Sequence, residues 1–479
     1  MESRFIDLHL HPAIKPLGKS FSATPGVNHP NKNHANSIWN YDPPGPLDKI
    51  TNIVSSLTKF RQADFTALAK GGAEVVVVSL CGLEKGFVMT KLGTKLVGDV
   101  LSDLVAGVGL KRINHIQQMT GYFADLEMEY EFYRQLDGEK VRIDGQWHQY
   151  KLVSSFQEIA DHSDNTVRTI YVILTIEGGH VFDCGLGMMN RKADPEHVLA
   201  NVDRVKQWQT RLFFMGLTHH FDNELVGHAQ SLSGLVGNVC DQREGMNEGF
   251  SDLGWKVLRK LLDNTNGRRV LIDLKHMSIK SRNEYYGFLK NEYPDEIIPL
   301  LVSHGALTGL KSHRELVEDG FQNSGKFQTN DINFYDDEII RIAESGGLFG
   351  VQFDERRLGS RQEIRESGMS LSRRKMLFKK SKLIWNQIQH MAEVLDRNNQ
   401  FAWGIQCIGS DNDGMVNPLN GYWTAEEMPI LDSYLEKHAW NFITSREARN
   451  LKPYNKLSAD GIVERFMHTN AWEFLKRNF

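Results

Sequence analysis

The sequence predicts an α/β protein, a (β/α)8 TIM barrel with long insertions after strands one, two and seven. Eight short segments rich in β-branched and aliphatic residues are expected as strands, and segments with helical periodicity lie between them. Apolar runs such as Val75–Val78 are typical of parallel strands that are covered on both faces. Regular alternation of such strands with helices favours a barrel.

The expected elements cover most of the chain. The strands are Phe5–His11, Glu74–Cys81, Ile170–Glu177, Phe213–His219, Val270–His276, Pro299–His304, Gly347–Phe353 and Ala402–Asp411. The helices are Phe65–Lys70, Pro195–Trp208, Asn247–Leu262, Lys280–Leu289, Asp336–Glu344, Lys375–Asp396 and Ala459–Arg477.

Three connections are long, namely residues 12–60, 83–169 and 354–400. The second contains an expected hairpin around Arg142–Leu152, with Asp144-Gly145 at the turn. All three follow strands, so we expect them at the C-terminal face of the barrel, where barrel enzymes hold their active sites. Barrels of this kind exceed 400 residues by lengthening loops, so a single domain over 1–479 is expected.

Composition excludes several classes of protein. A formal net charge of −4 without a sustained basic run argues against nucleic-acid binding. No stretch is apolar enough to span a bilayer, and a first strand from about residue 5 leaves no room for a signal peptide. Four scattered cysteines indicate neither a disulfide framework nor a thiolate cluster. We expect a cytoplasmic protein acting on a small molecule, with homo-oligomer formation left open.

Residues with metal-binding or acid–base chemistry end six of the eight strands. His9 and His11 are two apart on a strand and so project from one face. Such a pair makes half of a transition-metal site, the alternative being two histidines satisfied by hydrogen bonds. The other strand ends carry Glu177, His219, His276, His304 and Asp411. Parallel strands of one barrel bring their C-terminal ends to one ring, so these side chains are expected to meet.

The segments around these residues resemble one family. They are Glu-Gly-Gly-His (177–180), Leu-Thr-His (217–219), Asp-Leu-Lys-His (273–276), Ser-His (303–304) and Gly-Ser-Asp-Asn-Asp-Gly (409–414). In this order they resemble the membrane (renal-type) dipeptidase family of the amidohydrolase superfamily, from residue 5 to about 415. The resemblance implies a binuclear metal-dependent hydrolase that cleaves a small amide, a dipeptide foremost, with metal-activated hydroxide. It implies two divalent cations, with zinc as the expected metal.

The same resemblance implies the ligands. His9, His11 and Glu177 would hold one metal, and Glu177, His276 and His304 the other, with the Glu177 carboxylate bridging. Two cations close together need an anionic ligand between them. The family pairs a histidine with an aspartate on strand one, whereas this chain has two histidines, which removes one negative charge from the site.

Catalytic roles follow from the resemblance as well. Asp411 would deprotonate the attacking water and pass the proton to the leaving amine, with Asp413 as a rival. His219 would stabilise the oxyanion of the tetrahedral intermediate and contact the substrate. Arg314 would bind the substrate carboxylate through its planar guanidinium. A surface ion pair of Arg314 with Glu315 or Glu318 is the alternative.

Strand alternation gives expectations for three neighbours of these residues. If the strand continues past His219, His220 points to the opposite side, and we expect it to be structural. Lys275 is expected to point away from the site while His276 points inward. His180 is expected either to support a metal ligand or to lie at the surface.

Three other functions are alternatives to a dipeptidase. A mononuclear deaminase of the same superfamily is disfavoured because Ser303-His304-Gly305-Ala306 lacks the expected Glu and Glu177 would have no role. A lactonase or other ester hydrolase with the same metals stays open. A non-catalytic barrel that binds a partner is disfavoured because every ligand type is present together with Asp411.

Overall fold

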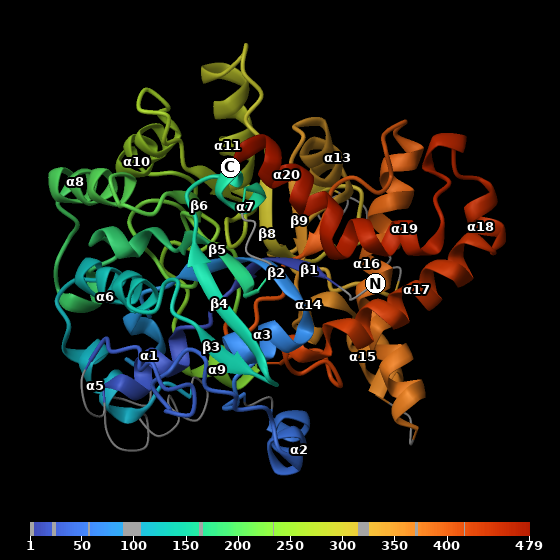
Figure 1. Ribbon diagram of the computed structural model, residues 1–479. Helices are drawn as coiled ribbons and strands as arrows, with labels where there is room; N and C mark the ends of the chain where they lie inside the picture. The colour runs from blue at the N-terminus through green and yellow to red at the C-terminus, as the bar shows by residue number, and fades with distance from the viewer. Residues whose placement is uncertain are drawn as a thin grey trace.

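The structure, a computed structural model, describes residues 4–21, 25–55, 58–89, 107–161, 166–232, 234–314, 325–368, 372–415 and 417–479. Eight parallel strands form a closed barrel in the order β2-β1-β10-β9-β8-β7-β6-β5, and pairing of β2 with β5 completes the ring. The predicted (β/α)8 fold is therefore confirmed. Figure 1 shows the strands at the centre with helices around them.

The barrel strands agree with the expected ones in number and order. They are β1 (Phe5–Leu10), β2 (Ala73–Leu80), β5 (Arg168–Glu177), β6 (Leu212–Gly216), β7 (Leu271–Asp273), β8 (Leu301–Gly305), β9 (Leu348–Val351) and β10 (Gln406–Ile408).

The predicted hairpin is present outside the ring. Strands β3 (Val141–Ile143) and β4 (Gln146–Leu152) pair antiparallel across Asp144 and Gly145, which both have positive φ. β4 pairs in parallel with the first half of β5, through residues 168–172, whereas β6 pairs with residues 174–177 further along. The long β5 thus joins the hairpin to the barrel.

Helices cover the outside of the barrel. Those between or after barrel strands are α3 (Phe65–Gly71), α6 (Phe123–Arg134), α7 (Phe156–Ala160), α8 (Pro195–Lys206), α10 (Asp252–Leu262), α11 (Ile279–Glu292), α13 (Asp336–Glu344), α16 (Arg373–Arg397), α19 (Ala459–Glu464) and α20 (Asn470–Asn478). The additional ones are α1 (Ile14–Ser20), α2 (Pro46–Ser55), α5 (Leu110–Gln118), α9 (Gly234–Val239), α14 (Glu355–Leu358), α15 (Arg361–Gly368), α17 (Met428–Ile443) and α18 (Arg446–Arg449).

Side-chain caps fix where several helices begin. Asp64 accepts a hydrogen bond from the amide of Ala67 at the start of α3, and Ser251 accepts one from Gly254 at the start of α10. The Ser251 cap explains why α10 begins at Asp252 rather than at the predicted residue 247.

Three barrel strands end three residues earlier than expected, which matters for the site. β6 ends at Gly216, β7 at Asp273 and β10 at Ile408, so His219, His276 and Asp411 lie in the loops beyond. His276 and Asp411 have positive φ, at 65° and 60°. Side chains do not alternate between two faces once the strand has ended, so predictions that extended the alternation past these ends fail.

The long connections differ in one respect from the prediction. The three predicted ones contain helices α1 and α2, α5 to α7, and α14 to α16, respectively. A further long connection, residues 217–251, joins β6 to α10 and carries α9. Figure 1 shows α2 projecting from the rest of the molecule at the bottom of the view.

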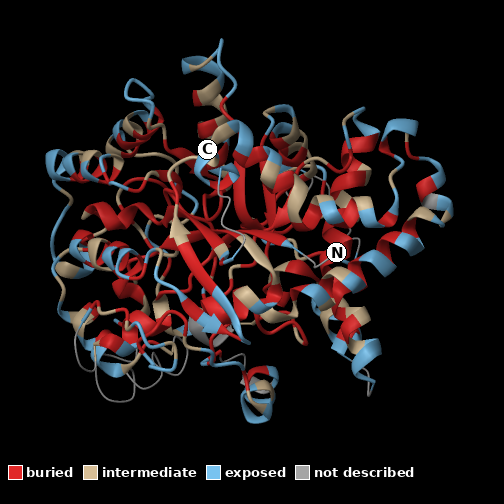
Figure 2. Ribbon diagram, viewed as in Figure 1, coloured by how far each residue is buried: buried red, intermediate tan, exposed pale blue. Residues whose placement is uncertain are grey.

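Burial follows the layers of the barrel. The strands are buried almost throughout, and the surrounding helices bury one side and expose the other (Figure 2). Val75–Val78 are fully buried, as expected for a strand that is covered on both faces. Among the described residues, no helix is both long enough and apolar enough to cross a membrane.

Candidate metal centre

Glu177 lies at the centre of the site, as the last residue of β5. Its Oε2 is 3.2 Å from Nε2 of His11 and 3.5 Å from Nε2 of His9. Its Oε1 is 3.1 Å from Nε2 of His276 and 3.5 Å from Nε2 of His304. The two carboxylate oxygens therefore face different pairs of histidines, which are the two pairs that the sequence predicted.

The donor atoms are spaced as cation ligands are. Ligands at the corners of a tetrahedral zinc site, about 2.1 Å from the ion, are about 3.4 Å from one another. The four separations around Glu177 lie near this value, and Nε2 of His9 and Nε2 of His11 are 3.0 Å apart. Oε1 of Glu177 is buried and has no hydrogen-bond partner in the part of the chain that the structure describes. The residues fit a pair of divalent cations.

Hydrogen bonds orient two of the histidines. Nδ1 of His11 lies 3.0 Å from the carbonyl oxygen of Ser79, to which only a protonated nitrogen can donate. Its Nε2 lone pair is then left for a cation. Nδ1 of His304 lies 2.8 Å from the hydroxyl of Ser303, which itself donates to Asp273. Such outer partners fix the ring orientation of a metal ligand.

Burial and charge set the protonation of these groups. Burial lowers the pKa of His9 to about 4 and that of His276 to about 3, so both rings are neutral at pH 7. Burial lowers the pKa of His11 as well, but the hydrogen bond and charge of Glu177 outweigh it and raise the value to about 9. Burial opposes ionisation of Glu177, yet the surrounding histidines hold its pKa well below the usual value.

His219 lies beside this centre and is held by a second glutamate. Its Nδ1 is 2.7 Å from Oε2 of Glu84, and its Nε2 is 3.6 Å from Oε2 of Glu177. Burial lowers the pKa of His219, but the charges of Glu177 and Glu84 together raise it above the ordinary value. A protonated imidazole in this place can donate a hydrogen bond to an anionic oxygen in the site.

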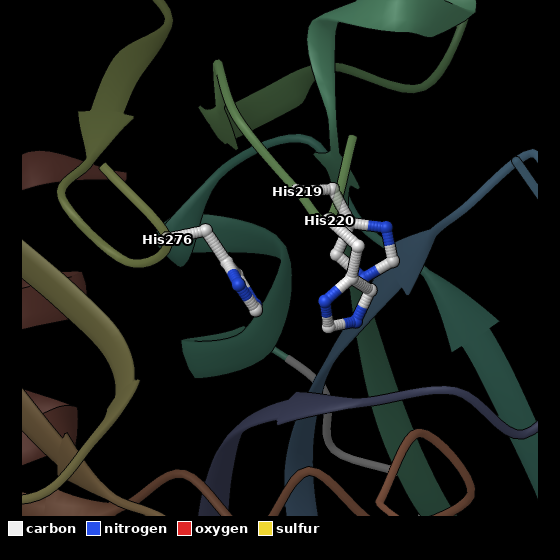
Figure 3. A group of neighbouring side chains, drawn as sticks. All are labelled: His219, His220 and His276. Carbon is white, nitrogen blue, oxygen red and sulfur yellow. The ribbon is translucent and has the colours of Figure 1, made fainter. Parts of the chain in front are cut away.

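His220 lies in the same space, contrary to the prediction. Its ring centroid is 3.9 Å from that of His219, and Figure 3 shows both rings facing the ring of His276. The ligand nitrogens of the three residues lie within 4.8 Å of one another. Because β6 ends at Gly216, the chain no longer alternates at residue 220. The Nδ1 of His220 is 2.6 Å from the hydroxyl of Ser231.

The two candidate bases occupy different environments. Oδ1 of Asp411 is 3.7 Å from Nε2 of His11 and 4.0 Å from Nε2 of His9. Asp413 instead accepts hydrogen bonds from Lys15 and from the backbone amides of Gln62 and Ala63. The Asp413 carboxylate therefore bonds to other segments of the chain, whereas the Asp411 carboxylate faces the candidate metal centre.

Lys275 and His276 both line the cavity at the site, so the prediction that Lys275 points away is wrong. β7 ends at Asp273, and the positive φ of His276 turns the chain within the next three residues. Both neighbouring side chains are thereby directed inward.

Arg314 is exposed and does not line this cavity. Its role in binding substrate stays a prediction, and its alternative partners Glu315 and Glu318 lie outside the described residues.

A cavity of about 190 Å³ opens at the metal centre. All three predicted insertions contribute to its wall, and so does the connection that carries α9. One side is apolar, with Leu83, Phe87, Val88, Val108 and Ile113. Gln352, Arg356 and Arg357, which follow β9, provide a polar side.

Some residues near the site could not be identified from the pattern of strand ends. Glu84 lies four residues past β2, so a search of strand ends does not find it. Cys81 directly follows β2, and its Sγ lies 3.9 Å from Nδ1 of His219. His180 is buried, with Nε2 2.5 Å from the carbonyl oxygen of Gly82, so it is not a surface histidine.

Comparison with known proteins supports the fold. A metallopeptidase from Rhodobacter sphaeroides, solved with a phosphinate mimic of the dipeptide L-Ala-D-Ala, is similar at 14% identity over 100% of both chains, with a TM-score of 0.51. A dipeptidase described as a metallopeptidase of family M19 is similar at 14% identity over 100% of this chain and 99% of its own, with a TM-score of 0.50. No protein-family model and no curated protein matches the sequence. At this identity the likeness shows a shared barrel fold.

Proposed function

We propose that this protein is a metal-dependent hydrolase that holds two divalent cations and cleaves a small amide, a dipeptide foremost. The observation that carries the proposal is the division of the Glu177 carboxylate, with one oxygen toward His9 and His11 and the other toward His276 and His304. The similar solved structures include a metallopeptidase bound to a dipeptide mimic, which agrees with this assignment.

The ligands suggest the metal. Imidazole nitrogens with one carboxylate suit zinc among the abundant divalent cations. His9, His11 and Glu177 would hold one ion, and Glu177, His276 and His304 the other. Bound cations would supply Lewis acidity to the scissile carbonyl and lower the pKa of water in the site.

Asp411 is the proposed proton carrier. Burial and the charge of Glu177 raise the pKa of Asp411 to about 7, against the opposing charges of His11 and Lys275. Divalent cations would favour its ionised form, which accepts a proton from water. After attack on the carbonyl carbon, the protonated carboxyl donates to the nitrogen of the leaving amine as the C–N bond breaks.

His219 is the proposed oxyanion donor. Glu84 holds its Nδ1, so the Nε2 side is turned toward Glu177 and the cavity. In the tetrahedral intermediate the former carbonyl oxygen carries negative charge, and a hydrogen bond from Nε2 would stabilise it more than the neutral ground state.

Metal analysis and a cleavage assay test the proposal together. Purified protein reconstituted with Zn²⁺ should bind two ions per chain and hydrolyse L-Ala-L-Ala or L-Ala-D-Ala to free alanine. The matched variant Glu177→Gln should show neither. Protein that binds no cation would overturn the metal centre. Two ions without cleavage of any dipeptide would overturn the substrate class and favour an ester substrate such as a lactone.

A further inference from the structure

Three side chains with hydrogen-bond donors that have no acceptor among the described residues line the polar side of the cavity. The donors are Nζ of Lys275, Nε2 of Gln352 and the part of the Arg357 guanidinium that does not bind the carbonyl of Ser231, from the loops that follow β7 and β9. Buried donors are nearly always paired in folded proteins, so a group of unpaired ones beside a cavity indicates a missing acceptor.

Lys275 is deeply buried, with 2% of its surface exposed. In the described part of the chain its Nζ has no ion pair and no hydrogen bond, although its backbone amide donates to Asp273. Burial, and then the charge of Arg357, lower its pKa to about 8. Both cationic side chains line the same cavity.

Gln352 follows the last residue of β9 and is also 2% exposed. Its backbone amide donates to the carbonyl of Gly305 at 2.9 Å, which fixes the residue against β8. Nε2 of its side chain is buried and lacks a hydrogen-bond partner among the described residues. An acceptor from a ligand would satisfy this amide.

Arg357 differs from its neighbour Arg356 in its partners. Arg356 donates hydrogen bonds to both carboxylate oxygens of Asp354. Its Nε is 3.0 Å from Oδ1, and its Nη2 is 2.5 Å from Oδ2. Arg357 donates only to the carbonyl oxygen of Ser231 and makes no ion pair within the described residues. Most of its five donors are therefore free to bind an anion.

The acids in the cavity wall do not neutralise this group. Asp354 is held by Arg356, and Asp413 by Lys15. Glu177 and Asp411 belong to the metal centre, where cations would take up their charge. Lys275 and Arg357 thus leave the polar side of the cavity with an excess of positive charge.

We propose that Lys275, Gln352 and Arg357 form the subsite that binds the carboxylate of the substrate. The proposal rests on the proposed function, because it places this carboxylate on an amide whose carbonyl is at the metal centre. Arginine presents paired donors that match the two oxygens of a carboxylate. The apolar side, with Phe87 and Val108, would receive an apolar group at the other end of the substrate. This assigns to Arg357 the role that the sequence suggested for Arg314.

Binding of two matched ligands tests the subsite. We would titrate the zinc-loaded protein by calorimetry with a phosphinate mimic of Ala-Ala and with its C-terminal carboxamide, which lacks the charge. Wild type should bind the acid at least about tenfold more tightly than the amide. Arg357→Gln should remove this preference by weakening binding of the acid alone. Gln352→Leu should reduce the preference less, and the exposed control Arg314→Gln should leave it unchanged.

Several outcomes would overturn the subsite. These are equal binding of acid and amide by wild type, no binding of the acid, or a selective loss in Arg314→Gln. Equal weakening of both ligands in Arg357→Gln, with Gln352→Leu unchanged, would mean that Arg357 acts only in folding. Because the readout is binding, an Arg357-dependent preference without peptide cleavage would uphold the subsite while the hydrolase assignment fails. Peptide cleavage without a preference for the acid would overturn the subsite while the hydrolase assignment is upheld.

Discussion

Nζ of Lys15 lies 2.8 Å from Oδ1 of Asp413 in a buried ion pair between residues 398 apart in the sequence. Asp413 also accepts hydrogen bonds from the backbone amides of Gln62 and Ala63. It thereby holds the loop that precedes α3 against the loop that follows β10. Within the described residues, the Asp411 carboxylate has no such partners, and it faces His9 and His11. This difference distinguishes Asp413, whose carboxylate holds two loops together, from Asp411, the proposed proton carrier.

Asp411→Asn should abolish most activity and preserve the fold. An amide cannot accept the proton of the attacking water, and loss of a general base lowers kcat by about 100-fold or more. We expect two metal ions per chain and an unchanged melting temperature, checked by elemental analysis and calorimetry. Loss of the metals together with activity would instead make Asp411 a ligand, a role compatible with its position near His9 and His304.

Asp413→Asn should act on stability rather than on chemistry. It leaves the ammonium of Lys15 buried without its counter-ion, which costs about 3–5 kcal/mol of unfolding free energy. Urea titration of the metal-free protein measures this loss. Replacing Lys15 by Met in the same chain should recover part of it, because no charge is then left unpaired. A stable Asp413→Asn with reduced kcat would contradict the structural role.

Glu177→Gln and Glu84→Gln should separate metal binding from oxyanion stabilisation, since both glutamates contact His219. Glu177→Gln removes the shared anionic ligand, so both metals and activity should be lost. Glu84→Gln should retain two metals but lower kcat, because the pKa of His219 falls when the adjacent charge is removed. Elemental analysis with steady-state kinetics distinguishes them. Equal metal loss in both variants would refute the separate roles.

Metal affinity should rise with pH between about 6.5 and 9. In the metal-free protein Glu177 and Asp411 outweigh burial and raise the pKa of His11 to about 9. A cation at His11 must displace this proton, so the apparent affinity should increase by up to about tenfold per pH unit until the ring is neutral. Chelator competition at pH 6.5, 7.5 and 8.5 measures the slope. A flat profile would mean that His11 does not ligate.

The raised pKa of His11 also affects the stability of the metal-free protein. The folded pKa of His11 lies above the unfolded value, so its contribution is complete below pH 6.5 and is lost as pH rises through 9. His11→Gln should remove this pH-dependent part, measured as the change in unfolding free energy between pH 7 and 9.5. An identical loss in wild type and variant would exclude His11 as its source.

The sequence by itself determined the barrel and the residues that meet at its rim. Apolar strands of the Val75–Val78 type recur between amphipathic helices, and only a parallel sheet covered on both faces buries them all. Histidines and acids at successive strand ends then converge whatever the loops do, because strand direction fixes where each end lies. Glu177, His9 and His304 could be placed together for that reason.

Only the tertiary structure decided where the side chains that follow the strand ends point and which residues they contact. His220 and Lys275 face the cavity because β6 and β7 end early and the backbone turns at His276, and local periodicity carries no information about such a turn. The partner of Asp413, Lys15, and the partner of Arg357, the carbonyl of Ser231, come from loops that are distant in sequence. Long-range packing sets those contacts, so the assignment of a base and of a carboxylate subsite required the folded chain.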